Sequence, residues 1–153
     1  MRVVEVATTF PGSVHEAESL WYDTDRWAAW VVGLAHVQSV SGAWPGVGAE
    51  VRWRSSPAGR GSVVERVTEY QRLEGQTLEI EDDSIRGRQR ITFAPDGDRV
   101  AVRLSLVYEL KRRSLPMALV DVLFIRRAML ATLEETLSRF GGELQAVRGP
   151  GVG

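Results

Sequence analysis

The feature that most constrains the fold is a long helical pattern between Ser114 and Gly141. Ser114 followed by Pro116 is typical of a helix start, and the pair Gly141-Gly142 is typical of a helix end. No glycine or proline interrupts residues 117–140. Apolar residues recur there at helical spacing, namely Leu119, Val122, Leu123, Met129, Leu130, Leu133, Leu137 and Phe140. The pattern predicts one helix of about seven turns, with a broad apolar face that another element must cover.

Most of the remaining chain alternates apolar and polar residues, which is the period of a β-strand. The alternation predicts strands at 3–10, 37–41, 50–55, 62–70, 76–82, 85–93 and 99–110. Short loops join consecutive strands from the second onward, and such loops favour an antiparallel meander over crossover units. We therefore predict a curved antiparallel sheet of about seven strands wrapped on the long helix.

Two short helices are expected between the first two strands. A capping-box pattern, Ser13 with Glu16, predicts a helix through about residue 22. Asp23 or Thr24 can cap a second short helix, which carries Trp27 and Trp30. All of these elements belong to one domain at 1–148, and the glycine-rich tail 149–153 is expected to be disordered.

The composition excludes several classes of function. A net charge of −1 gives no general case for nucleic acid as a partner. The chain has no cysteine, which removes disulfides and thiolate chemistry. No apolar run approaches the roughly 20 residues of a membrane span, and the N-terminus offers no signal-peptide core. A cytoplasmic location is expected, although a disulfide-free exported protein would have the same composition.

Metal and cofactor sites are not expected either. His15 and His36 lack the spacing and the companions of a metal site. The sequence contains no nucleophile elbow and no glycine-rich phosphate loop followed by a lysine-bearing helix. We therefore predict neither a metal nor a cofactor.

A family resemblance is carried by five features of the sequence. They are the first strand running into Pro11, the helix end Leu20-Trp21-Tyr22-Asp23, the segment Trp27-Ala28-Ala29-Trp30, the turn Gly46-Val47-Gly48 before a strand, and the final strand-to-helix step. Over essentially the whole chain this order resembles the START and Bet v 1-like (SRPBCC) superfamily, in its polyketide cyclase/dehydrase and lipid-transport branch. The resemblance implies an α+β helix-grip fold with an apolar cavity between the sheet and the C-terminal helix. It does not select a function, because such folds host carriers, cyclases, hydrolases and interaction modules.

Strand parity indicates which residues face such a cavity. Trp53, Leu104 and Tyr108 belong to apolar rows, and Gln89 shares the parity of Phe93. Trp44 lies in a Gly/Pro loop, where it either guards the cavity mouth or anchors the loop. The expected ligand contacts are Trp44, Trp53, Gln89, Phe93, Leu104, Tyr108, Leu119 and Leu123.

Glu65 and Tyr108 are the candidates for catalysis. Glu65 lies between Val63 and Val67, so an inward orientation would place a carboxylate on an apolar face. Such a group needs a partner or a raised pKa, which would suit general acid/base chemistry. The alternative face of this strand, with Val64 inward, turns Glu65 to solvent opposite Arg52 or Arg54. We favour the solvent-facing interpretation, because exposed glutamates are far commoner than buried ones.

Three hypotheses about function follow. The first is binding or carriage of a hydrophobic small molecule such as a lipid, an isoprenoid or a polyketide-like compound. The second is a polyketide cyclase or dehydratase in which Glu65, Gln89 or Tyr108 assists proton transfer. The third uses the apolar stretch 115–125, flanked by basic residues, for peripheral membrane contact or a dimer contact. We favour a lid role for this stretch, and the chain is expected to be a monomer or a homodimer.

Overall fold

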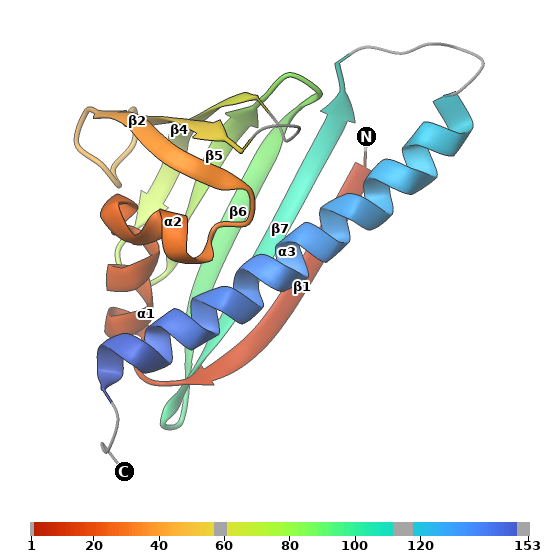
Figure 1. The fold of residues 1–153 in the computed structure, drawn as a ribbon. Helices are drawn as coiled ribbons and strands as arrows, with labels where there is room; N and C mark the ends of the chain where they lie inside the picture. Colours follow the sequence, from red (N-terminus) through yellow and green to blue (C-terminus); the bar gives the residue numbers. More distant parts are fainter. Residues whose placement is uncertain (1, 57–60, 112–117, 150–153) are drawn as a thin grey trace.

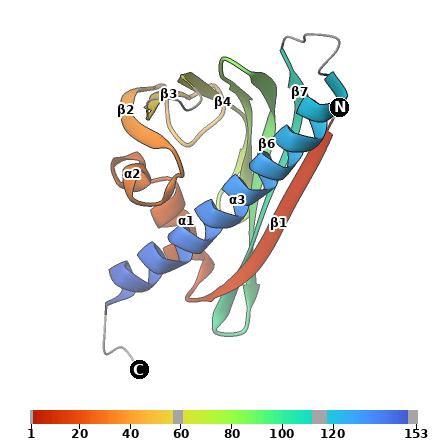
Figure 2. The ribbon, with the colours of Figure 1, turned by 45° about the vertical axis from the view of Figure 1, so that its right-hand side comes forward.

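The computed structural model describes residues 2–56, 61–111 and 118–149, without the side chains of 118–123. Seven strands form one antiparallel sheet in the order β1-β7-β6-β5-β4-β3-β2. They are β1 (Arg2–Pro11), β2 (Leu34–Ser41), β3 (Glu50–Ser55), β4 (Ser62–Gln71), β5 (Gly75–Glu81), β6 (Ile85–Asp96) and β7 (Arg99–Leu110). The helix α3 (Ala118–Arg148) crosses one face of this curved sheet and runs beside β1 (Figure 1, Figure 2). The predicted helix-grip fold is confirmed.

The connections of the sheet explain its order. Strands β2 to β7 follow one another as antiparallel neighbours, so each pairs with the next along the chain. Strand β1 pairs with β7 instead, with Val4 opposite Leu106 and Phe10 opposite Val100. This pairing brings the first and last strands together at one end of the sheet, where α3 covers them.

The short helices lie between β1 and β2, as predicted. In α1 (Val14–Trp21) the capping box is complete, because the Ser13 hydroxyl accepts from the Glu16 amide at 3.1 Å and the Glu16 carboxylate accepts from the Ser13 amide at 2.9 Å. A 3₁₀ turn, η1 (Thr24–Arg26), and one helical turn, α2 (Trp27–Trp30), follow. Trp21, Trp27 and Trp30 are all buried between these helices, the sheet and α3.

The apolar rows identified by parity form the core. Val51 and Trp53 of β3, Leu78 and Ile80 of β5 and the alternate residues of β7 from Val100 to Tyr108 are buried. Leu133, Leu137, Phe140 and Leu144 of α3 pack against them. The core therefore lies between the inner face of the sheet and one side of α3.

The predicted end of the long helix at Gly141-Gly142 is wrong. Helix α3 continues through both glycines to Arg148, and Gly149 follows it with φ +85°, the left-handed conformation of a helix C-terminal glycine. Gly141 instead permits close packing, since a Cβ there would lie 2.3 Å from Cε1 of Phe10 on β1. The predicted start at Ser114 and the tail 150–153 lie outside the described residues.

Candidate functional site

A small cavity lies between the inner face of the sheet, the short helices and α3. Its volume is about 50 Å³, which is room for one or two water molecules at roughly 30 Å³ each. Its walls are mostly aromatic and aliphatic, with a few polar groups set among them. The lining comprises Trp21, Trp27, Trp30, Val31, Val32, Trp53, Glu65, Gln76, Leu78, Ile80, Gln89, Leu104, Thr132, Leu133 and Thr136.

Glu65 faces this cavity and not the solvent. Its residue is 6% exposed, and the indole N–H of Trp53 donates to its carboxylate at 2.6 Å. The favoured interpretation, an exposed Glu65 opposite Arg52 or Arg54, is wrong. In the β3–β4 register Glu65 lies opposite Val51, so it belongs to the inner row. A short hydrogen bond to a charged acceptor offsets part of the cost of burying the carboxylate.

Other polar groups border the same cavity. The Thr136 hydroxyl of α3 accepts from the amide of Val32 at 3.3 Å, which links α3 to the segment between α2 and β2. The Gln76 amide donates to the carbonyl of Pro45 at 3.0 Å. The side-chain amide of Gln89 is half-buried and has no hydrogen-bond partner among the described residues. The cavity is thus an apolar space with a carboxylate and an uncommitted amide in its wall.

The structure brings together only some of the predicted ligand contacts. Trp53, Gln89 and Leu104 line the cavity, whereas Phe93 is buried outside the described lining. Leu119 and Leu123 belong to α3, but their side chains lie outside the description. Their contact with a ligand therefore stays a prediction. Trp30 and Thr136 line the cavity but are not among the predicted ligand contacts. Trp30 was expected only as a residue of the second short helix, and a helix threonine carries no pattern of its own.

Tyr108 and Trp44 have different surroundings. Tyr108 is 2% exposed, and its hydroxyl has no hydrogen-bond partner within the described part of the chain. Burial raises its pKa above the ordinary 10.0. It does not belong to the described lining of the cavity. Trp44 donates its indole N–H to the carbonyl of Tyr22 at 2.8 Å and packs on Trp27. It therefore anchors the β2–β3 loop to the short helices.

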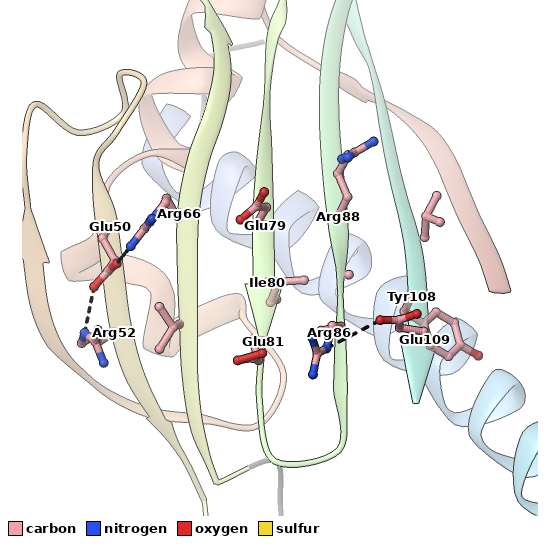
Figure 3. Close-up of a pocket in the computed structure, with 13 residues that line it drawn as sticks. Glu50, Arg52, Arg66, Glu79, Ile80, Glu81, Arg86, Arg88, Tyr108 and Glu109 are labelled. Carbon is pink, nitrogen blue, oxygen red and sulfur yellow. Dashed lines mark hydrogen bonds and ion pairs between the residues drawn. The ribbon is translucent and has the colours of Figure 1, made fainter. Parts of the chain in front are cut away.

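A larger hollow on the outer face of the sheet has a different character. It is an open groove of about 930 Å³ lined by alternating charged side chains (Figure 3). The Glu50 carboxylate is 2.8 Å from Arg52 and 3.1 Å from Arg66, and Arg86 is 3.6 Å from Glu109. These side chains are mostly exposed and neutralise one another, as expected for the wet face of an antiparallel sheet. Such an open groove with charged walls does not favour the binding of a hydrophobic ligand.

The described part of the chain offers neither a group of metal ligands nor a membrane-spanning helix. It contains no group of three or more His, Asp or Glu side chains able to hold a metal ion. No helix within it is long and apolar enough to cross a membrane. The stretch 115–125 predicted for surface contact lies largely outside the described side chains, although Phe124 near its end is 72% exposed.

Comparison with known proteins identifies the family. Residues 1–145 match the model of the family described as polyketide cyclase / dehydrase and lipid transport. The chain belongs to this family. Members of the polyketide cyclase/dehydrase and lipid transport family share a fold that binds hydrophobic small molecules. No curated protein matches the sequence significantly.

Solved structures agree with this assignment at the level of fold. The Zhui aromatase/cyclase from Streptomyces sp. R1128 superposes with a TM-score of 0.81 at 14% identity, covering 98% of each chain. A START superfamily protein from Mycobacterium smegmatis gives 0.76 at 16% identity, covering 95% of this chain and 98% of its own. Norcoclaurine synthase from Thalictrum flavum, in complex with dopamine and hydroxybenzaldehyde, gives 0.65 at 15% identity, covering 94% and 88%.

Proposed function

We propose that this protein binds a hydrophobic small molecule between its sheet and α3, with a polar group of the ligand seated beside Glu65. The observation that carries the proposal is a buried carboxylate in the wall of an otherwise apolar cavity. Ligand sites typically combine apolar walls with a few placed polar groups, which fix the orientation of the ligand. Membership in the polyketide cyclase/dehydrase and lipid transport family supports the same class of ligand.

The small volume of the cavity limits how much of such a ligand can fit without a movement of the protein. About 50 Å³ holds a polar group but not an apolar body. For the apolar part of the ligand to enter, α3 or the segment between α2 and β2 must therefore move away from the sheet. The 3.3 Å hydrogen bond from Val32 to Thr136 joins these two elements at the cavity wall. Burial of the ligand would contribute roughly 25 cal/mol per Å² of apolar surface, before the cost of that movement.

A second candidate is an enzyme of the cyclase or dehydratase type. The buried position of Glu65 favours it, because a carboxylate in a water-poor site beside a bound carbonyl compound can accept and return a proton. The Trp53 indole, bonded to one carboxylate oxygen at 2.6 Å, would hold the acid in place. The likeness in fold to an aromatase/cyclase and to norcoclaurine synthase is consistent with this candidate.

Native mass spectrometry of freshly purified protein, followed by solvent extraction, tests the first proposal. A hydrophobic molecule bound one-to-one is expected, and Glu65→Gln is expected to weaken its retention. Glu69→Gln is the matched control, because Glu69 lies on the same strand with its side chain 69% exposed. An equal effect of the two substitutions would contradict a role for Glu65 in binding.

The same variants separate holding from turnover. If the extracted molecule is incubated with the protein, a carrier returns it unchanged. An enzyme converts it to a product of different mass or spectrum, and Glu65→Gln then abolishes the conversion while binding persists. A bare protein mass, together with no binding of added lipids or aromatic ketones, would refute both candidates.

A further inference from the structure

Trp30 carries a buried N–H group that has no hydrogen-bond partner among the residues that the structure describes. The residue is 1% exposed, and its indole packs on Trp21 at 4.6 Å and on Phe140 at 5.1 Å between ring centroids. Three other tryptophans have bonded N–H groups: Trp27 donates to the Trp21 carbonyl, Trp44 to the Tyr22 carbonyl and Trp53 to Glu65. Trp30 therefore differs from these three tryptophans, although the buried hydroxyl of Tyr22 in the same aromatic cluster also has no partner within the described part of the chain.

An unpaired buried donor is costly, and native proteins nearly always satisfy such groups with protein, water or ligand atoms. The rings of Trp21, Trp27 and Phe140 pack against the Trp30 indole. Trp30 also lines the cavity of about 50 Å³ that contains Glu65 and Gln89 in its wall. A water-sized molecule does not reach Nε1 of Trp30 in this structure, so an acceptor atom can meet the indole N–H only when the cavity widens to admit the ligand.

We infer that Trp30 is a specificity-determining residue that donates its indole N–H to a hydroxyl group of the ligand. This inference rests on the proposed function. A hydroxyl both accepts and donates, so it takes the hydrogen of Trp30 and gives its own to Glu65 or Gln89. A carboxylate accepts several hydrogen bonds, and the side-chain oxygen of Gln89 can accept one as well. The ligand class is an uncharged alcohol or phenol on an apolar body.

The experiment compares phenol with toluene, which have the same shape and differ in a hydroxyl against a methyl group. Their affinities are measured by NMR titration for the wild type, Trp30→Phe and Trp44→Phe. Trp30→Phe is expected to lower the phenol-to-toluene affinity ratio about tenfold, the size of one buried hydrogen bond. Trp44→Phe removes an indole N–H that is already bonded to the carbonyl of Tyr22, at a residue outside the described lining of the cavity, so the ratio is expected to stay unchanged.

A second readout does not depend on the variants folding. In the wild type, the indole N–H resonance of Trp30 is expected to shift with phenol and much less with toluene. Equal binding ratios in all three proteins, or an unmoved Trp30 resonance while phenol binds, would overturn the inference and leave the proposed function standing. Failure of both probes to perturb any cavity residue would overturn the inference and count against the proposed site as well.

Discussion

Two adjacent glycines in α3 offer a sharp test of how the helix is seated on the sheet. Gly141 faces β1, where an added Cβ would lie 2.3 Å from Cε1 and 2.7 Å from Cδ1 of Phe10. An added Cβ at Gly142 would meet no atom of the described residues within 4 Å, the adjacent helix backbone aside. Both have helical neighbours on each side, so replacing either with alanine gains about 1 kcal/mol of helix propensity. The two substitutions therefore differ only in the clash at Gly141.

The clash has a predictable size. The Phe10 ring packs on Phe140 with centroids 5.8 Å apart, so it cannot simply swing away. Overpacking of this kind costs about 1–3 kcal/mol. We expect Gly142→Ala to be about 1 kcal/mol more stable than the wild type, and Gly141→Ala to be about 1–3 kcal/mol less stable than Gly142→Ala.

Urea denaturation of the two variants measures this difference directly, and the melting temperatures should differ by about 2–4 °C per kcal/mol. If Gly141→Ala is as stable as Gly142→Ala, Phe10 does not contact α3 at this position. A glycine at position 141 would then not be required for the packing of α3 on β1.

Three further predictions concern protonation and the link between α3 and the short helices. The hydrogen bond from the Ser13 amide lowers the pKa of Glu16 below 4.5, so its stabilising effect is present above that pH and lost on acidification. In urea denaturation at a series of pH values, Glu16→Gln should therefore reduce the loss of unfolding free energy on acidification. Burial raises the pKa of all three tyrosines above 10.0, so the stability contributed by the neutral phenols is present below pH 10 and is lost as the pH rises from 10 through the raised pKa values. Tyrosinate absorbance should then appear together with loss of near-ultraviolet circular dichroism. Thr136→Val removes the hydrogen bond to Val32 and should destabilise the protein by about 1 kcal/mol, with faster hydrogen exchange at the Val32 amide.

The fold could be predicted because its signals are local. Alternation fixes which strands form, and the turn residues between them fix antiparallel pairing, so the predicted bounds of β3 (Glu50–Ser55) and β7 (Arg99–Leu110) agree with the structure. The helix end could not be predicted in the same way. Gly141 is required by a ring on β1 more than 100 residues away, and a local rule reads the same glycine as a stop signal.

The candidate site could be predicted only in part. Trp53, Gln89 and Leu104 follow from parity, since their strands have one clearly apolar face. Both faces of β4 carry apolar residues, so the alternation of the sequence alone does not show whether Glu65 faces the core or the solvent. The deciding contact comes from the neighbouring strand, where the Trp53 indole supplies a hydrogen bond that makes burial of the carboxylate tolerable. The unpaired N–H of Trp30 depends on the absence of an acceptor in three dimensions, which no sequence pattern records.

Given the position of Glu65, carriage and catalysis would differ in one event, which is the transfer of a proton between Glu65 and the ligand. Both functions would place the polar group of a ligand beside this carboxylate, because it lies in the wall of the cavity. Carriage requires only that Glu65 keep its hydrogen bonds while the ligand is held. Catalysis requires that Glu65 take a proton from the ligand and return it. Glutamine preserves the shape and much of the hydrogen bonding of the side chain but cannot exchange a proton in this way. Retained binding with lost conversion in Glu65→Gln would therefore assign catalysis, and weakened binding with no conversion in the wild type would assign carriage.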